Sequence, residues 1–327
     1  MSADLKHRIL SRVQADLVAV EAALRENLGA HLPIVSDVAG HLLFSGGKRL
    51  RPLLMVLSAR LCGYGGGREI FFSTVFEYLH TATLLHDDLV DGAVLRRGRK
   101  AAHAVWGNEV AVLVGDFLLA RSLTIASDTG MTDVIKVIAG ITESMSQGEI
   151  HQLTRKKHLD LAETEYLEII RRKTAVLMEG ACRVGALISG ADERRTAALT
   201  AYGHHLGMAF QMADDLLDYT ADTAILGKTV GADLREGKLT LPVIRALSAA
   251  GDDDRKTMER IITDGDFSVD DFNTLVGLLV SCGGIDAARA AAEGHVNAAK
   301  AELSAFADSP YRDTLKDIAD YALSRKH

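Results

Sequence analysis

Proline and aromatic residues are scarce in this chain of 327 residues. Its four prolines leave the 189 residues from Leu53 to Leu241 without one, and aromatic residues make up 5% of the sequence. Because proline interrupts helices and is frequent in the turns of β-proteins, this absence excludes an all-β fold with many turns. The chain is 48% hydrophobic and long enough to bury a large core. We therefore expect an all-α fold.

Cysteine is also rare. The three cysteines are odd in number and far apart, and no two of them have Cys-x-x-Cys spacing. Neither a disulfide framework nor a thiolate metal site is therefore expected. The N-terminus carries charged residues in its first turns and lacks the apolar core of a signal peptide. Together these features predict a cytoplasmic protein.

Positive charge is in deficit, since 37 Lys and Arg against 44 Asp and Glu give a net charge of −7. This balance excludes a nucleic-acid-binding protein that depends on a general basic field. We expect no nucleic acid among its partners.

Apolar residues recur every three or four positions along most of the chain, as they do on one face of a helix. No linker rich in Pro, Gly or Ser divides the pattern, so we expect a single domain over residues 1–327. The expected helices cover residues 5–28, 34–44, 52–62, 69–91, 107–128, 132–151, 161–189, 192–218, 242–250, 254–264, 270–282, 286–306 and 310–325.

Two segments, TLLHDDLVD and AFQMADDLLD, carry the same arrangement of aspartates. In a helix the first and last aspartates of each segment share a face, and the middle one is rotated from the first by about 100°. Like charges at this spacing cost roughly 0.2–0.5 kcal/mol per pair, and no Lys or Arg lies within four positions of either cluster. The first aspartate cluster is Asp87, Asp88 and Asp91, and the second aspartate cluster is Asp214, Asp215 and Asp218.

Bound cations would remove this repulsion. Each cluster follows an apolar stretch, which distinguishes it from an ordinary solvated helix end. Oxygen ligands predict a hard cation, and Mg²⁺ in particular combines one or two carboxylates with substrate phosphates. A di-iron site at Glu77 and His80 would need a second Glu-x-x-His pair on another helix, which we do not find. We expect Mg²⁺ and a phosphorylated substrate.

Four basic segments could bind the outer oxygens of that substrate. Guanidinium groups hold phosphate oxygens bidentately and lysines add point charges. Gly46 and Gly47 precede a helix that has Pro52 in its first turn, a setting where backbone amides can also receive a phosphate. This combination favours a diphosphate. The segments are GGKRLRP (46–52), RRGR (96–99), RRKT (171–174) and GKTVGADLREGK (227–238).

Taken in order, these motifs resemble those of the trans-isoprenyl diphosphate synthases, the polyprenyl synthetase family, and most resemble its octaprenyl and solanesyl diphosphate synthase branch. The resemblance covers residues 40–245 strongly and implies a single large helical bundle of the isoprenoid synthase (class I terpenoid synthase) type around a central cavity. It further implies a Mg²⁺-dependent prenyltransferase that condenses isopentenyl diphosphate head to tail with an allylic diphosphate such as farnesyl diphosphate. The segments that carry it are GGKRLRP, HTATLLHDDLVDGAVLRRGR, RRKTAVL, GMAFQMADDLLDYTAD and LGKTVGADLREGKLTLP.

The same resemblance implies a role for individual residues. The two aspartate clusters would supply the metal ligands, Asp87, Asp88, Asp91, Asp214, Asp215 and Asp218, for two or three Mg²⁺ ions. Catalysis would depend on Asp87, Asp88, Asp91, Lys173, Thr174, Gln211 and Asp214. The substrates would be held by Lys48, Arg51, His80, Arg96, Arg97, Lys173, Thr174, Gln211, Lys228 and Lys238, with Asp233 completing the late motif.

Product length depends on side chains that precede the first aspartate cluster on its helix. The growing chain would descend beside that helix, and a small Ala82, where short-chain relatives commonly carry a bulky aromatic, leaves the path open. Thr83 is also small, and Leu79, Tyr78 and Val75 lie further down as candidate floors of the cavity. We expect a long all-trans product, from octaprenyl to decaprenyl diphosphate, for the side chain of a quinone.

Three alternatives stay open: a short-chain farnesyl or geranylgeranyl diphosphate synthase, a terpene cyclase, and a non-catalytic helical subunit of a heteromeric synthase. The resemblance favours a homodimer. Gly92 and Ala93 stand where many relatives carry a polar or acidic pair. The basic run 155–158 suggests a solvated loop or, at most, peripheral contact with an anionic membrane.

Overall fold

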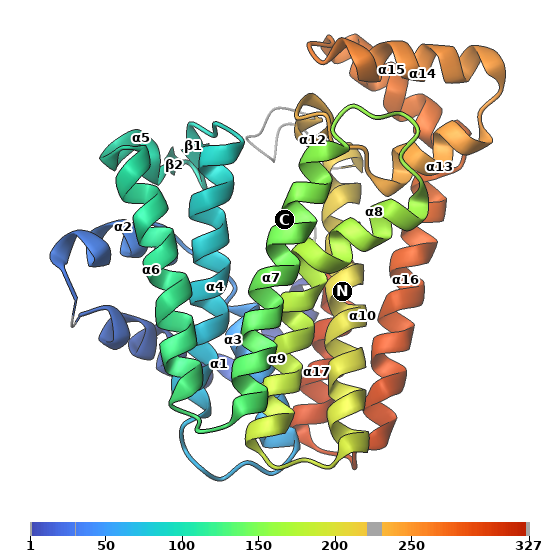
Figure 1. Cartoon of the computed structure of the whole chain (residues 1–327). Helices are drawn as coiled ribbons and strands as arrows, with labels where there is room; N and C mark the ends of the chain where they lie inside the picture. The colour runs from blue at the N-terminus through green and yellow to red at the C-terminus, as the bar shows by residue number, and fades with distance from the viewer. Residues whose placement is uncertain (1, 30, 221–230, 325–327) are drawn as a thin grey trace.

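The computed structural model describes residues 2–29, 31–220 and 231–324, and most of these residues are helical (Figure 1), which confirms the predicted fold class. The elements are α1 (Ser2–Gly29), α2 (Pro33–Leu43), α3 (Leu50–Leu61), α4 (Glu69–Val90), β1 (Leu95–Arg96), β2 (Arg99–Lys100), α5 (Ala102–Trp106), α6 (Asn108–Ser127), α7 (Thr132–Thr154), α8 (Glu163–Ile170), a π turn (Arg171–Ala175), α9 (Val176–Ile188), α10 (Glu193–Thr220), α12 (Ala232–Arg235), α13 (Leu241–Ala249), α14 (Asp252–Asp264), α15 (Val269–Ser281), α16 (Gly284–Glu302), a 3₁₀ turn (Leu303–Ala305) and α17 (Pro310–Ser324).

One predicted helix is irregular. Residues 163–188 of the predicted segment 161–189 are helical, but the π turn Arg171–Ala175 replaces the α-helical pattern between α8 and α9. The short hairpin β1–β2 and the short helices α5 and α12 were not predicted either. The remaining boundaries agree with the predicted ones to within a few residues, which is the usual uncertainty at helix ends.

Two glycines allow the π turn to lie between α7 and α10. A Cβ atom at Gly148 would lie 2.8 Å from the backbone nitrogen of Lys173, and one at Gly207 would lie 2.5 Å from the Cα of Ala175. Both separations are shorter than real Cβ contacts, so only glycine permits this approach. Because π turns often occur at functional sites, the position of Lys173 and Thr174 within this turn supports their assignment as candidate site residues.

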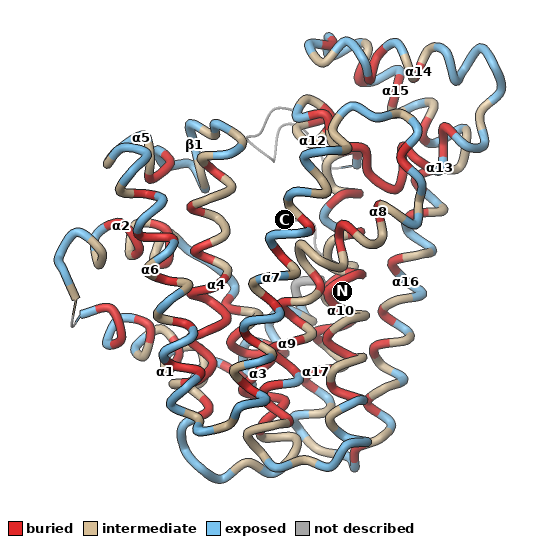
Figure 2. The backbone as a smooth tube through the Cα atoms, viewed as in Figure 1, coloured by how far each residue is buried: buried red, intermediate tan, exposed pale blue. Residues whose placement is uncertain are grey.

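The long helices pack side by side, with their inward faces buried and their outer faces exposed (Figure 2). α4 packs against α3 and α6, whereas α10 packs against α9 and α16. α10 contributes Leu206 to the larger apolar core and Met212 to a second core that is formed mainly with α8 and α12–α16. A single helix thus joins both cores, and the single domain over residues 1–327 stays a prediction.

α4 and α10 run in the same direction and end near one another, beside the hairpin and α12 (Figure 1). Asp91 is the C-cap of α4, and Gly92 follows it with a φ of +64°, a left-handed conformation that suits glycine. Both aspartate clusters therefore lie toward the same end of the bundle.

α6 has an unusual surface. It is long and apolar enough to cross a membrane by length and composition alone. One face, with Ala111, Val114 and Leu118, is buried, and the helix packs against α4. Another face exposes Val112 and Leu113, the latter to 65%.

Three histidines meet between α10 and α16, away from the aspartate clusters. His205 Nδ1 and His295 Nδ1 lie 3.0 Å apart, and the ring of His204 is 5.2 Å from that of His205. Burial, followed by the nearby His205 and His204, lowers the pKa of His295 to about 4. His204 also faces Glu179, and Glu302 acts on His205 in the opposite sense to burial.

This cluster predicts a loss of stability in mild acid. A histidine whose pKa is lower in the folded chain binds more protons when unfolded, so its contribution to stability is complete above pH 6.5 and declines as the pH falls toward 4. Between pH 7.5 and pH 5 we expect the melting temperature of the original protein to fall relative to that of His295→Gln, in which the buried carboxyls are unchanged. Equal decreases for the two proteins in scanning calorimetry would contradict this assignment.

Candidate functional site

Two adjoining cavities open where the aspartate clusters meet. The larger, about 890 Å³, lies between the segment 45–51 and helices α4, α7 and α10, and the smaller, about 260 Å³, extends toward α8 and residues 233–240. Residues that line both are Leu84, Asp87, Lys173, Thr174, Gln211 and Asp214. The structure thus brings together predicted residues from three separate motifs.

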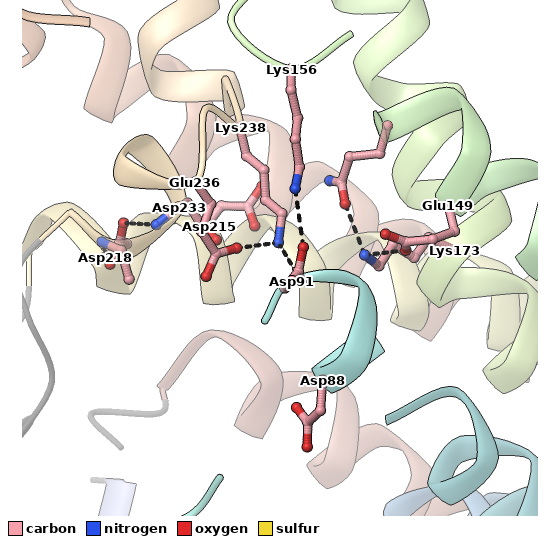
Figure 3. A network of polar contacts seen from close by, with 12 residues as sticks. Asp88, Asp91, Glu149, Lys156, Lys173, Asp215, Asp218, Asp233, Glu236 and Lys238 are labelled. Atoms are coloured by element: carbon pink, nitrogen blue, oxygen red, sulfur yellow. Dashed lines mark hydrogen bonds and ion pairs between the residues drawn. The ribbon is translucent and has the colours of Figure 1, made fainter. Parts of the chain in front are cut away.

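The first aspartate cluster divides into two kinds of side chain. Asp87 lines both cavities, and burial, opposed by Lys173, raises its pKa to about 6. Asp88 is buried instead, and its Oδ1 accepts a hydrogen bond of 2.7 Å from Arg96 Nε. Figure 3 shows that the carboxylate of Asp88 points away from Asp91 and its partners. Asp87 and Asp91 therefore face the smaller cavity, and Asp88 does not line it.

Asp91 lies between two lysines. Its Oδ1 is 3.0 Å from Lys156 Nζ and its Oδ2 is 3.5 Å from Lys238 Nζ (Figure 3). Burial opposes ionisation of this carboxyl, yet the ammonium groups of Lys238 and Lys156 outweigh it and hold its pKa below the ordinary value. Asp91 is therefore ionised at neutral pH, with positive charge on both sides.

The second aspartate cluster divides in a similar way. Asp214 lines both cavities. Asp215 is buried, accepts hydrogen bonds of 2.7 Å from Tyr166 Oη and from Gln211 Nε2, and has a pKa that burial raises above the ordinary value. Asp218 accepts from the backbone N–H groups of Ala232 and Asp233, each at 3.1 Å. The last aspartate of this cluster thus fixes the start of α12.

The donor set suits Mg²⁺. Among the residues described, no three His, Cys, Asp or Glu side chains converge closely enough to hold a metal ion by themselves. Carboxylate oxygens of Asp87, Asp91 and Asp214 nevertheless line a small cavity with lysines around it. A cation that takes one or two carboxylates and completes its shell with substrate oxygens and water fits such a set.

Lys173, Thr174 and Gln211 lie at the junction of the two cavities. Lys173 Nζ is 2.8 Å from Gln152 Oε1 and forms an ion pair with Glu149, both on α7. Thr174 Oγ1 donates to Gln211 Oε1 at 2.9 Å, and the amide nitrogen of Gln211 then donates to Asp215. The π turn thus directs Lys173 toward α7 and Thr174 toward α10, and both residues line the two cavities.

The basic segment 46–52 and the β1–β2 hairpin meet at the other side of the larger cavity. Lys48, Arg51, His80 and Arg97 all line it, and the guanidinium of Arg97 donates to the carbonyl of Gly46. Burial, and then the arginines around it, lowers the pKa of His80 well below the ordinary value. A neutral histidine among arginines is an environment for an anionic ligand.

Three further predicted residues belong to the late basic segment 227–238. Lys238 faces the smaller cavity and contacts both Asp91 and Glu236. Lys228 lies outside the described residues. Asp233 lines the smaller cavity, and burial raises its pKa above the ordinary value.

The candidate chain-length residues separate on α4. Thr83 lines the larger cavity, whereas Ala82, Leu79, Tyr78 and Val75 are buried and, in the described chain, lie outside its lining. Tyr78 points elsewhere, because its hydroxyl donates to the carbonyl of Leu24 on α1 at 2.9 Å. The lining of the same cavity also includes Met145 and Leu177.

Sequence reasoning missed Glu149 and Gln152, which contact Lys173, and Tyr166, which holds Asp215. Glu149 and Gln152 lie three positions apart on one face of α7, and the helix predicted over 132–151 ends one residue before Gln152. Lys156 was seen only as part of the basic run 155–158.

Comparison with known proteins agrees with the resemblance seen in the sequence motifs. A family model described as polyprenyl synthetase matches residues 32–279. The chain is 36% identical over 310 residues to the octaprenyl diphosphate synthase of Escherichia coli (strain K12), covering 95% of this chain and 96% of that one.

Two solved structures are similar over nearly the whole chain. A decaprenyl diphosphate synthase from Rhodobacter capsulatus has a TM-score of 0.91 and 42% identity, with 98% of this chain and 99% of that one covered. A polyprenyl synthase from Caulobacter crescentus CB15, complexed with calcium and isoprenyl diphosphate, has a TM-score of 0.91 and 40% identity, with 98% of each chain covered.

Proposed function

Because the chain belongs to the polyprenyl synthetase family, it is a prenyl diphosphate synthase, and we propose that its two aspartate clusters bind the allylic diphosphate through Mg²⁺. It elongates that substrate with isopentenyl diphosphate to a long-chain all-trans polyprenyl diphosphate. The observation that carries the site assignment is that Asp87 and Asp214, from helices far apart in the sequence, line the same two cavities as Lys173.

The smaller cavity suits the allylic diphosphate. Two or three Mg²⁺ ions held by Asp87, Asp91 and Asp214 would neutralise its charge and favour its departure. Lys173 and Lys238 supply ammonium groups on the same cavity for the outer oxygens. The apolar side chains of Leu84 and Phe210, which line the larger cavity, limit access of water to the positive charge that remains on the allylic group.

Thr174 and Gln211 lie where that charge develops. Their oxygen atoms are oriented by the hydrogen bond between them and by Asp215, so they cost little reorganisation when the allylic carbon becomes positive. The double bond of isopentenyl diphosphate then attacks this carbon, and loss of a proton leaves a chain five carbons longer.

Isopentenyl diphosphate fits the opposite wall. Lys48, Arg51 and Arg97 line the larger cavity next to His80, and guanidinium groups bind diphosphate oxygens bidentately. The backbone at Gly46 and Gly47 contributes to the same wall. In this proposal the second substrate binds within the cavity that the allylic tail also enters.

The exposed face of α6 supports a homodimer, since Val112 and Leu113 would otherwise present apolar surface to water. Two copies that pack α6 against α6 would bury it. A cytoplasmic location and a role in making the side chain of a quinone complete the proposal.

A product assay tests this function. The purified protein is incubated with Mg²⁺, farnesyl diphosphate and labelled isopentenyl diphosphate, and the products are measured by mass spectrometry. We expect octaprenyl to decaprenyl chains. Products of fifteen or twenty carbons would instead indicate a short-chain synthase, and no incorporation of label would indicate a non-catalytic subunit.

Thr83→Phe is expected to shorten the product by at least one five-carbon unit. Thr83 lines the cavity, so a phenyl ring there reduces the space for the tail. Ala82 is fully buried outside that lining, and Ala82→Tyr overpacks the core at a cost of roughly 1–3 kcal/mol. Product lengths and melting temperatures of both variants check this. Full-length products from Thr83→Phe would mean that the tail follows another path.

A further inference from the structure

Lys156 lies in the loop between α7 and α8 and points into the smaller cavity. Its Nζ is 3.0 Å from Asp91 Oδ1, and its side chain is 26% exposed. The residue lines the cavity together with Asp87, Lys173 and Lys238. Figure 3 shows its ammonium group next to the carboxylate of Asp91. A side chain expected to lie in a solvated loop is therefore part of the proposed diphosphate site.

The structure divides the basic run in which Lys156 occurs. Arg155 pairs with Asp160 and Glu165, and Lys156 with Asp91. Lys157 and His158 are exposed. Only half of the run is thus directed outward, which weakens the case for attraction to an anionic membrane and leaves Lys156 with a different task.

The loop is fixed to the segment that carries Lys238. Lys157 adopts a left-handed conformation with a φ of +63°, and its N–H donates to the carbonyl of Gly237 at 2.7 Å. Lys156 and Lys238 are therefore held as a pair, and each contacts a different oxygen of Asp91. The position of Lys156 follows from backbone hydrogen bonding and does not depend on its own flexible side chain alone.

The charges around Lys156 and Lys238 indicate a role for the two lysines. Lys238 also contacts Glu236, whereas the carboxylate placed against Lys156 is that of Asp91. If Asp91 gives its oxygens to a metal ion, the ammonium of Lys156 is left beside a second positive charge, which is unfavourable unless an anion joins them. A diphosphate bound to the same metal supplies that anion within reach.

We propose that Lys156 is a further substrate-binding residue, which exchanges Asp91 for an oxygen of the metal-bound diphosphate when the substrate arrives. The proposal rests on the function proposed above, because it requires a diphosphate at this cavity. Lys156 would then act beside Lys173 and Lys238, from a part of the chain outside the motifs that carry the family resemblance.

The test compares Lys156→Gln with Lys156→Arg and with Lys157→Gln, whose changed side chain is exposed in the same loop. Calorimetry measures binding of inorganic diphosphate in the presence of Mg²⁺, and separately of Mg²⁺ alone. Since a hydrogen bond to a charged group is involved, we expect Lys156→Gln to weaken diphosphate binding by roughly 10- to 100-fold. Lys156→Arg should stay within a few-fold of the original protein, and Lys157→Gln should match it.

Binding of Mg²⁺ alone separates this role from a structural one. Removing the ammonium from Asp91 should leave Mg²⁺ affinity unchanged or increased, because a competing cation is gone. A Lys156→Gln protein that binds Mg²⁺–diphosphate as tightly as the original overturns the role of Lys156 and leaves the proposed function standing. Failure of the original protein to bind Mg²⁺–diphosphate overturns both. A Lys156→Gln protein with weakened Mg²⁺ binding indicates that Lys156 supports the metal ligands, and also overturns the proposal.

Discussion

Replacing Asp87 by alanine is expected to lower the rate of product formation on the order of 10³-fold or more. Asp87 lines both cavities, and its carboxylate faces the positions where Lys173 and Asp214 also lie. Stabilisation of a departing diphosphate by metal ions contributes several kcal/mol to the transition state, and each 1.36 kcal/mol is about tenfold in rate. Removing one ligand weakens both metal and substrate binding.

The same substitution should not destabilise the chain. Burial raises the pKa of Asp87, and Glu149 and Asp91 add to the unfavourable charge, so the carboxylate is a cost to the folded state in the absence of a cation. The measurement is turnover of labelled isopentenyl diphosphate, with the melting temperature determined in parallel without Mg²⁺. Asp253→Ala, on the exposed start of α14, serves as the control. Asp87→Ala with near-normal turnover would remove this aspartate from the site.

Replacing Glu77 by leucine is expected to lower the free energy of unfolding by about 3–5 kcal/mol. Glu77 Oε1 is 2.7 Å from Arg49 Nη1, and both side chains are only 6% exposed. Arg49 is the N-cap of α3 with a φ of +47°, and it also contacts Glu21 and the carbonyl of Leu43. Without Glu77 the buried guanidinium of Arg49 loses the more buried of its two acidic partners. The remaining contact with Glu21 makes the lower part of that range the better expectation.

Urea unfolding, followed by circular dichroism, measures this loss. A double variant, Arg49→Met with Glu77→Leu, should recover much of the stability, because replacing both members of a buried ion pair by apolar groups is often neutral. Asp133→Leu is the control, since the pair of Asp133 with Lys136 is exposed and contributes little. Glu77→Leu with unchanged stability would mean that Arg49 is already satisfied by its other contacts.

Much of the fold follows from local sequence patterns. The spacing of apolar residues predicts most helices to within a few residues, and the scarcity of proline predicts their length. The π turn at 171–175 could not be predicted from the spacing of apolar residues. It depends on how closely α7 and α10 approach at Gly148 and Gly207, which is a tertiary property.

The site shows a similar limit. Helical geometry correctly separates Asp88 from Asp87 by its rotation, but it cannot say which of the two faces a cavity, because packing of the whole bundle decides that. Lys156 could not be assigned at all, since its place depends on a backbone hydrogen bond between Lys157 and the distant Gly237. The chemical roles of the predicted residues stay predictions for the variants above to test.

The separation of α4 and α10 has a mechanical consequence. Their main packing partners differ, α3 and α6 for one and α9 and α16 for the other, and the cavities lie between the two aspartate clusters that they carry. Metal ions shared by Asp87 and Asp214 would therefore act as a cross-link between α4 and α10. At a ligand concentration about 100 times the dissociation constant, such a link stabilises the folded chain against unfolding by roughly 2.7 kcal/mol. The bound substrate and its metal ions would therefore also hold α4 and α10 together, and this link would be lost at the end of each reaction cycle.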